Sequence, residues 1–294
     1  MRLIKTSGLI IFSLLLVGCS NEKSAAKTAF LMNTAVTAAV YGTDEYDAEK
    51  ILDVVKECED ELTDNSFSDS DALNMLDSIR SDSDGMFDVS IGTLTKLWGI
   101  GTENARVPSQ EEIDAALKDR TVLDPGAFGK GYACDRIKEY LDSSDIPGAC
   151  VAVGGSILCY GSRDGVKNGA EGYTVAVRDP DGNVDDYVAT FSVRDAVVST
   201  SGDYEHVFEQ DGKKYHHILN AKTGYPVESG LRSVTVISES GLVSDALSTA
   251  AFLLGPEEGR KLLEKYNAEG IFIDKENNVF ATNGVKLTLQ KGSR

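Results

Sequence analysis

The order of the expected elements along this chain predicts an α+β fold. Helical segments dominate the first half, short apolar strands follow from about Ala149 to Val236, and a helical pair and further strands end the chain. Such segregated runs of helices and strands are typical of α+β proteins, because α/β proteins alternate the two. No tandem repeat is visible, and a mature chain of about 275 residues suits one large domain or two closely merged ones.

The first half of the chain is expected to form one strand and several helices, which are assigned from apolar periodicity and from a capping box. Residues 30–42, FLMNTAVTAAVYG, read as a strand, and residues 47–62 read as a helix because apolar side chains recur there every three or four residues. Two short helical pieces and Trp98 come next. A helix is expected from Ser109 to Leu117, since Ser109 and Glu112 have the spacing of a capping box. Residues 128–141 are the next predicted helix.

The second half begins with a sequence pattern that is typical of antiparallel β-hairpins. Between Ala149 and Val236, apolar runs are broken by GG, DPDGN and EQDGKK. A helical pair is predicted at residues 243–254 and 256–267, and short strands follow it.

The N-terminus has the form of a secretory signal that ends in a bacterial lipobox. Arg2 and Lys5 precede an apolar run, and the run leads to Leu-Val-Gly-Cys at residues 16–19. The run is shorter than the about 20 residues that span a bilayer, although an uncleaved anchor helix is the alternative. We therefore expect a signal peptide at residues 1–18, a lipidated Cys19, a tether at residues 19–29 and a domain at residues 30–294. The mature chain would be exported and anchored to the membrane by lipid.

Charge and cysteine content exclude some classes of protein. The formal net charge is -18, and 16 acidic residues stand against three basic ones between Asp44 and Asp88. This acidity argues against a nucleic-acid partner. Four further cysteines, at positions 58, 134, 150 and 159, lack metal-type spacing and are expected as buried thiols, although an exported chain permits a disulfide.

Three motifs contain residues that could act in catalysis, in metal binding or in phosphate binding. Two of the three histidines, His216 and His217, are neighbours on an expected strand, so only one of them can face a given site. Asp245 and Thr249 lie four apart in a predicted helix, where their oxygens could meet one hard cation, although a helix-end charge and a packing residue explain them as well. The glycine-rich segment 123–135 with Lys130 could bind phosphate, but it matches neither nucleotide-binding fingerprint.

Six segments stand in order along the chain: Met32-Asn33-Thr34, SDGMFDVSIGTLTKLWGIG (83–101), LDPGAFGKGYACD (123–135), VAVGGSIL (151–158), VVSTSGDYEHVFEQDGKKYHHILNAKTGYPV (197–227) and SVTVISESGLVSDALSTAAFLLG (233–255). Together they resemble the signature segments of the ApbE-like FAD:protein FMN transferases, in which the first segment usually reads Met-Gly-Thr. The resemblance implies a T-fold-like domain with an antiparallel sheet and packed helices. It also implies a Mg²⁺-dependent enzyme that transfers FMN from FAD to a Thr or Ser hydroxyl of a partner and releases AMP.

The resemblance also assigns roles to residues. A Mg²⁺ site would fall on the Ala127 carbonyl, Asp245 and Thr249, and His217 would be the catalytic base. Contacts to the flavin nucleotide would fall on Met32, Met86, Phe87, Asp88, Asp124 and Lys130. The chain is shorter than the family pattern between Leu62 and Leu73, where part of the flavin cover would be lost, and between Leu117 and Thr121, where the change should be structural.

The implied partners are FAD and an acceptor protein with an Asp/Ser-Gly-Ala-Thr-type motif. A subunit of an Rnf-type or Na⁺-translocating NADH:quinone reductase complex would be such an acceptor. Two other functions stay open, namely hydrolysis of FAD to FMN and AMP, and flavin binding without transfer. A solute-binding lipoprotein would need two similar lobes, and the sequence shows no such duplication.

Overall fold

A computed structural model describes residues 23–290 except 64–66, 167 and 171. The expected signal peptide and Cys19 therefore lie outside the described residues. None of the helices in the described part is both long and apolar enough to cross a membrane.

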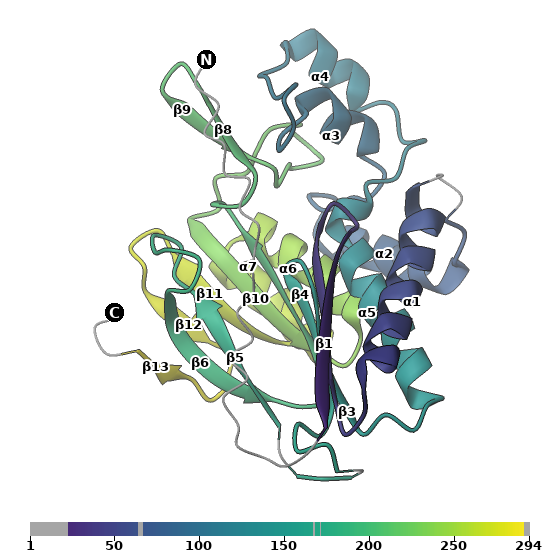
Figure 1. Ribbon diagram of the computed structural model, residues 1–294. Coiled ribbons are helices and arrows are strands. Elements are labelled where there is room, and N and C mark those ends of the chain that lie inside the picture. Colours follow the sequence, from purple (N-terminus) through teal and green to yellow (C-terminus); the bar gives the residue numbers. More distant parts are fainter. Residues whose placement is uncertain (1–22, 64–66, 167, 171, 291–294) are drawn as a thin grey trace.

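The described chain folds into helices and antiparallel strands, which confirms the predicted α+β class (Figure 1). The helices are α1 Glu45–Thr63, α2 Ser70–Asp82, α3 Gly92–Trp98, α4 Gln110–Ala116, the 3₁₀ turn η1 Pro125–Ala127, α5 Gly129–Asp142, α6 Gly241–Leu254 and α7 Pro256–Lys265. The strands are β1 Ser24–Leu31, β2 Thr34–Tyr41, β3 Gly148–Val153, β4 Ser156–Gly161, β5 Tyr173–Arg178, β6 Tyr187–Val193, β7 Ala196–Gly202, β8 Val207–Gln210, β9 Lys213–His216, β10 Leu231–Ser238, β11 Glu269–Asp274, β12 Val279–Ala281 and β13 Thr288–Leu289.

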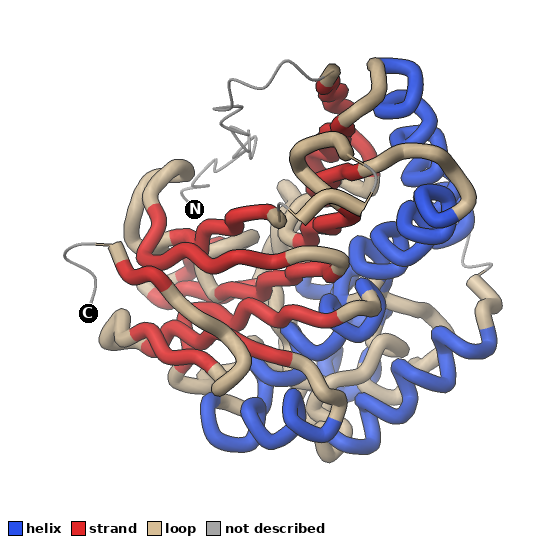
Figure 2. Tube along the Cα trace, turned by 90° about the horizontal axis from the view of Figure 1, so that it is seen from below, coloured by secondary structure: helices blue, strands red, loops and turns tan. Residues whose placement is uncertain are grey.

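An antiparallel sheet of eight strands, in the order β1-β2-β3-β4-β7-β10-β11-β12, forms the centre of the fold. Helices cover one face of this sheet, as Figure 2 shows. A smaller sheet, β13-β6-β5, packs its buried side chains, such as Val175 and Phe191, against the other face. The third sheet is the β8–β9 hairpin, which projects beside α3 and α4 (Figure 1).

The core between the helices and the large sheet is centred on α6. Nearly all of α6 is buried, because every residue in it except Asp245 is apolar or small. Helix α5 crosses it in backbone contact, since a Cβ added at Gly131 would lie 2.0 Å from the Gly241 carbonyl oxygen. Only glycine allows this approach, and it brings the N-terminal turn of α5 against the first turns of α6.

Two expectations for the N-terminal region are wrong. The tether expected at residues 19–29 overlaps β1, which begins at Ser24 and pairs with β2 from Ser24 opposite Tyr41 to Leu31 opposite Thr34. The strand expected at residues 30–42 is interrupted by a two-residue turn, in which Met32 and Asn33 have φ of 50° and 57°. Positive φ at both central residues is the signature of a tight hairpin turn, and here it presents Met32 and Asn33 to a cavity.

Most other boundaries follow the sequence. Helix α1 begins two residues before the expected range, and the capping box at Ser109 and Glu112 is present at α4. The four cysteines of the described part, at positions 58, 134, 150 and 159, are free and buried, as the sequence analysis expects.

Candidate active site

A cleft with two chambers lies where the tip of the β1–β2 hairpin, the start of α5 and the loop before β8 come together. The first chamber has a volume of about 280 Å³ and the second of about 380 Å³, sizes typical of small-molecule pockets. Residues that line both chambers are Asn33, Gly126, Lys130, Glu205, His206 and His217. The chambers are therefore two parts of one site, which meet at Lys130 and His217.

The crossing of α5 and α6 places a lysine beside a buried carboxylate. Asp245 is 3% exposed, and its Oδ2 accepts a hydrogen bond from the Gly131 amide at 3.0 Å. Lys130 Nζ lies 3.4 Å from the same oxygen and donates to the Gly126 carbonyl at 2.8 Å. The Lys130 ammonium and the Asp245 carboxylate thus both line the cleft. The ammonium could contact an anionic group of a ligand, and the carboxylate could contact a cation bound with it.

The three candidate metal ligands line the first chamber. Thr249 follows Asp245 by one helical turn and shares a hydrogen bond with Ser201 at 3.1 Å, while Ala127 is the last residue of η1. All three offer oxygen atoms, which are the ligands that Mg²⁺ prefers. Within the described ranges, no group of three or more His, Cys, Asp and Glu side chains could hold a metal ion. A cation here would depend on one carboxylate together with neutral oxygens, water and the ligand's own phosphates.

The neighbouring histidines point to different surroundings. His216 ends β9, its Nε2 lies 2.9 Å from the Val227 carbonyl, and its ring packs edge-on against Phe252 of α6. His217 lines both chambers. The expected division, in which His217 faces the site and His216 packs, agrees with this placement, and the role of His217 as a base stays a prediction.

The hydrogen bonding of His217 defines its basic nitrogen. Nδ1 lies 3.2 Å from the Glu205 carbonyl, which can only accept, so Nδ1 carries the proton and Nε2 is left with the free electron pair. Burial, followed by the nearby His206 and His216 rings and Lys130, lowers the pKa of His217 to about 3. The ring is therefore neutral at physiological pH, and its Nε2 carries no proton.

The candidate contacts to the flavin nucleotide divide between the chambers. Phe87, Asp88 and Asp124 line the first chamber, Met32 lines the second, and Lys130 lines both. Asp124 is fixed by hydrogen bonds from Thr95 and from the Gly126 amide. Met86 is not brought to either wall; it packs against the core beneath them, and its carbonyl accepts from the Ala221 amide.

Sequence reasoning missed Glu205 and His206 in the loop before β8. The His206 ring stands edge-on to His217 with 5.3 Å between centroids, and its backbone has a positive φ of 39°. Val207 pairs with His216 in the β8–β9 hairpin, which places residues 206 and 217 next to each other beyond the paired ends. The turn signal at residues 210–214 implies this register, so the neighbourhood of His206 and His217 could have been predicted.

Comparison of the sequence with protein families shows which family the chain belongs to. The model of the ApbE family matches residues 32–272, which is most of the chain. The chain belongs to the ApbE family. The expectation of an ApbE-type enzyme is therefore confirmed.

Curated relatives and solved structures of the ApbE family agree with this assignment. An FAD:protein FMN transferase of Klebsiella pneumoniae is 29% identical over 91% of this chain and 95% of its own length. A protein of the same name from Treponema pallidum is 33% identical over 69% of this chain and 64% of its own length. The ApbE protein of Thermotoga maritima has a TM-score of 0.75 and 29% identity, covering 89% of this chain and 97% of that one. The flavinyl transferase ApbE of Pseudomonas stutzeri, with 27% identity, gives a TM-score of 0.71 over 90% and 96% of the two chains.

Proposed function

We propose that this chain transfers FMN from FAD to a Thr or Ser hydroxyl of a partner protein in a Mg²⁺-dependent reaction that releases AMP. The observation that carries the proposal is the convergence of Lys130, Asp245 and His217 on one cleft of an ApbE-family fold. Asp245, Thr249 and the Ala127 carbonyl would hold the ion. When bound, Mg²⁺ would neutralise charge on the pyrophosphate.

The residues of the chain suit the remaining steps. Lys130 can spread the charge of the pyrophosphate from the junction of the chambers, and this alignment and charge neutralisation are what phosphoryl transfer needs most. The acceptor hydroxyl oxygen forms a bond to the phosphorus of the FMN half, the bond between that phosphorus and the bridging oxygen breaks, and AMP leaves. The hydroxyl proton passes to Nε2 of His217, whose neutral ring is the form required.

Two alternative functions use the same residues differently. Water could replace the acceptor hydroxyl, which would make the chain an FAD pyrophosphatase, or the cleft could bind flavin without reaction. A bound hydroxyl has a higher effective concentration than water because it is already positioned, and this favours transfer once a partner is present. A storage protein has no need for a neutral histidine beside a lysine and a buried carboxylate.

We further propose that Cys19 is lipidated after removal of residues 1–18 and that the domain is exported and anchored to a membrane. The acceptor would then be a membrane-associated protein with an Asp/Ser-Gly-Ala-Thr-type motif, such as a subunit of an Rnf-type or Na⁺-translocating NADH:quinone reductase complex. The form of residues 1–19 supports the anchor.

The proposal is tested by incubating the protein with FAD, Mg²⁺ and an acceptor domain that bears this motif, followed by mass analysis. We expect AMP and an acceptor heavier by one FMN group, and EDTA should stop both. Free FMN with unmodified acceptor would favour the pyrophosphatase. Intact FAD after long incubation with a proven acceptor would favour the binding protein.

A further inference from the structure

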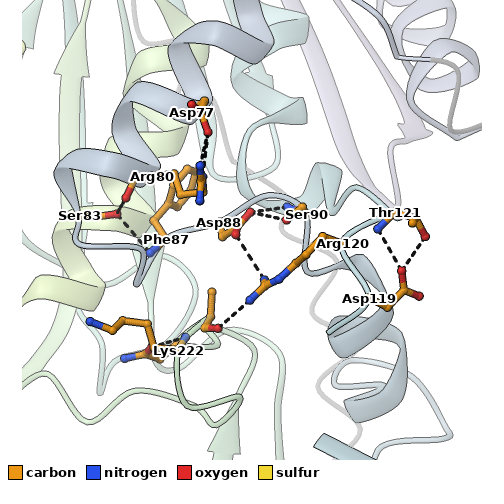
Figure 3. Close-up of polar contacts among 12 residues, drawn as sticks. Asp77, Arg80, Ser83, Phe87, Asp88, Ser90, Asp119, Arg120, Thr121 and Lys222 are labelled. Atoms are coloured by element: carbon orange, nitrogen blue, oxygen red, sulfur yellow. Dashed lines mark hydrogen bonds and ion pairs between the residues drawn. The ribbon is translucent and has the colours of Figure 1, made fainter. Parts of the chain in front are cut away.

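Three separate segments of the chain meet at one side of the first chamber. They are residues 86–90, residues 119–124 and the loop at residues 220–222 (Figure 3). The Gly92 amide donates to the Val122 carbonyl at 2.9 Å, and the Ala221 amide donates to the Met86 carbonyl at 3.0 Å. The first segment carries Phe87 and Asp88 to the chamber and the second ends at Asp124, which also lines it, so the contacts among the three segments help to set this part of the wall.

Arg120 is the side chain that joins all three segments. Its Nη1 donates to Asp88 Oδ2 at 3.3 Å and its Nη2 donates to the Ala221 carbonyl at 3.3 Å, as Figure 3 shows. The other Asp88 oxygen accepts from the Ser90 amide at 2.8 Å and from the Ser90 hydroxyl at 2.6 Å. Both carboxylate oxygens of Asp88 therefore have hydrogen-bond partners, and among the described residues Arg120 is the only such partner that comes from another segment.

The position of Arg120 itself is set by its neighbours. Asp119 accepts from the Thr121 amide and hydroxyl and, through its other oxygen, from Thr93 of α3 at 2.8 Å. These bonds hold the tight turn after α4 against α3, so the arginine extends from a rigid base. Its side chain is 39% exposed and does not line the chamber, whereas the Asp88 side chain is 11% exposed and does.

We propose that Arg120 is a positioning residue for the flavin nucleotide, acting through Asp88. Its planar guanidinium meets a carboxylate and a carbonyl at once, a task for which lysine has the wrong geometry. Without Arg120, Asp88 would keep its bonds to Ser90 but lose its link to the 220–222 loop, and the wall would lose its alignment with the ligand. This inference rests on the proposed function, since it takes the ligand of the first chamber to be FAD.

The test compares KM for FAD and kcat in the full-length protein with an acceptor domain present. Arg120→Ala should raise KM about tenfold, the scale of one hydrogen bond to a charged group, and leave kcat within about twofold. The melting temperature should fall by less than about 4 °C, since an exposed ion pair contributes little to stability. Arg120→Lys should also raise KM, because one ammonium cannot reach both acceptors.

Lys222→Ala is the matched control, because it removes an equal charge from the same region. Lys222 pairs with the exposed Asp84 at 2.8 Å and lines neither chamber, so its KM should equal that of the wild type. In an Asp88→Ala background, Arg120→Ala should change KM by less than about twofold, because its route to the ligand is already lost.

The outcomes separate this inference from the proposed function. A rise in KM for both Arg120 variants that disappears in the Asp88→Ala background supports the inference. An unchanged KM, or losses for Arg120 and Asp88 that multiply independently, overturns it while the enzyme assignment stands. A wild type that neither binds nor consumes FAD overturns both. If Arg120→Ala fails to fold, Arg120→Lys alone decides, and a wild-type KM for that variant overturns the inference.

Discussion

Replacing Asp245 by asparagine should abolish Mg²⁺-dependent turnover while the fold is retained. The substitution removes the single negative charge that the proposed metal site draws from the protein. It keeps a side-chain oxygen in place, and that oxygen can still accept the hydrogen bond that the Gly131 amide donates at 3.0 Å. Asp245→Ala removes this acceptor as well, so it should lower both the turnover and the free energy of unfolding.

The structure sets the expected magnitudes. In Asp245→Ala, a buried amide is left without a partner, which costs about 1 to 3 kcal/mol of unfolding free energy. Asp245→Asn should lose much less stability. Its turnover should fall at least about 10³-fold, which corresponds to about 4 kcal/mol in the activation barrier, since the charge that would hold the ion is gone.

Asp135→Asn is the matched control for this experiment. Asp135 is a half-buried carboxylate between α5 and α6, where it accepts from the Gly241 and Leu242 amides at 2.5 and 2.9 Å. It lines neither chamber of the cleft. The control should therefore melt at a lower temperature than the wild type and keep its turnover at saturating FAD.

The assay is release of AMP from FAD over a range of Mg²⁺ concentrations, with melting temperatures measured on the same samples. If Asp245→Asn turns over within about threefold of the wild type, a change below 1 kcal/mol in the barrier, the metal assignment is wrong. Equal losses of turnover in Asp245→Asn and Asp135→Asn would mean that both act through the packing of α5 on α6.

Three further predictions concern the histidines and the cysteines. His217→Ala should lower kcat about 10²- to 10⁴-fold and His216→Ala far less, and equal losses in steady-state assays would refute the assignment of their faces. Because burial lowers the pKa of His217 from 6.5 to about 3, its neutral ring stabilises the folded state fully above pH 6.5, and this contribution is lost as the pH falls toward 3. Melting temperatures across that window should therefore fall less steeply in His217→Gln, and parallel curves would argue against a buried neutral ring. Burial raises the pKa of Cys58 to about 12 and also raises that of Cys134, so a thiol reagent should modify these two cysteines only on unfolding; their rapid reaction in native buffer would contradict their burial.

The parts of the site that could be predicted from sequence are those set by local periodicity. Helical spacing placed Asp245 and Thr249 on one face, and both line the same chamber. Strand alternation predicted different surroundings for His216 and His217, and their partners do differ, although β9 ends at His216 and His217 lies just beyond it. In each case the relation spans fewer than five residues, so the geometry of one helix or strand is enough to determine it.

The relations that could not be predicted depend on contacts between distant segments. Strand β1 was missed because its sequence, SAAKTAFL, is half exposed along its length and carries little apolar signal. Its turn uses Met32 and Asn33 in place of the usual glycine, so the hairpin signal was absent. The ion pair of Lys130 with Asp245 and the link of Arg120 to Asp88 join residues 115 and 32 positions apart, and no local pattern indicates them.

If Cys19 carries a lipid, strand β1 also limits how far the cleft can lie from the membrane surface. The Lys23 carbonyl accepts a hydrogen bond from the Gly42 amide, so the folded domain begins at this residue. The chain from a lipidated Cys19 to Lys23 could therefore span at most ~14 Å. From Ser24 the eight residues of β1 lead to the cleft over a further ~26 Å. Under the proposed function, the acceptor hydroxyl would then have to come within about 40 Å of the bilayer surface, so its Thr or Ser would have to be presented by a domain that lies close to the same membrane.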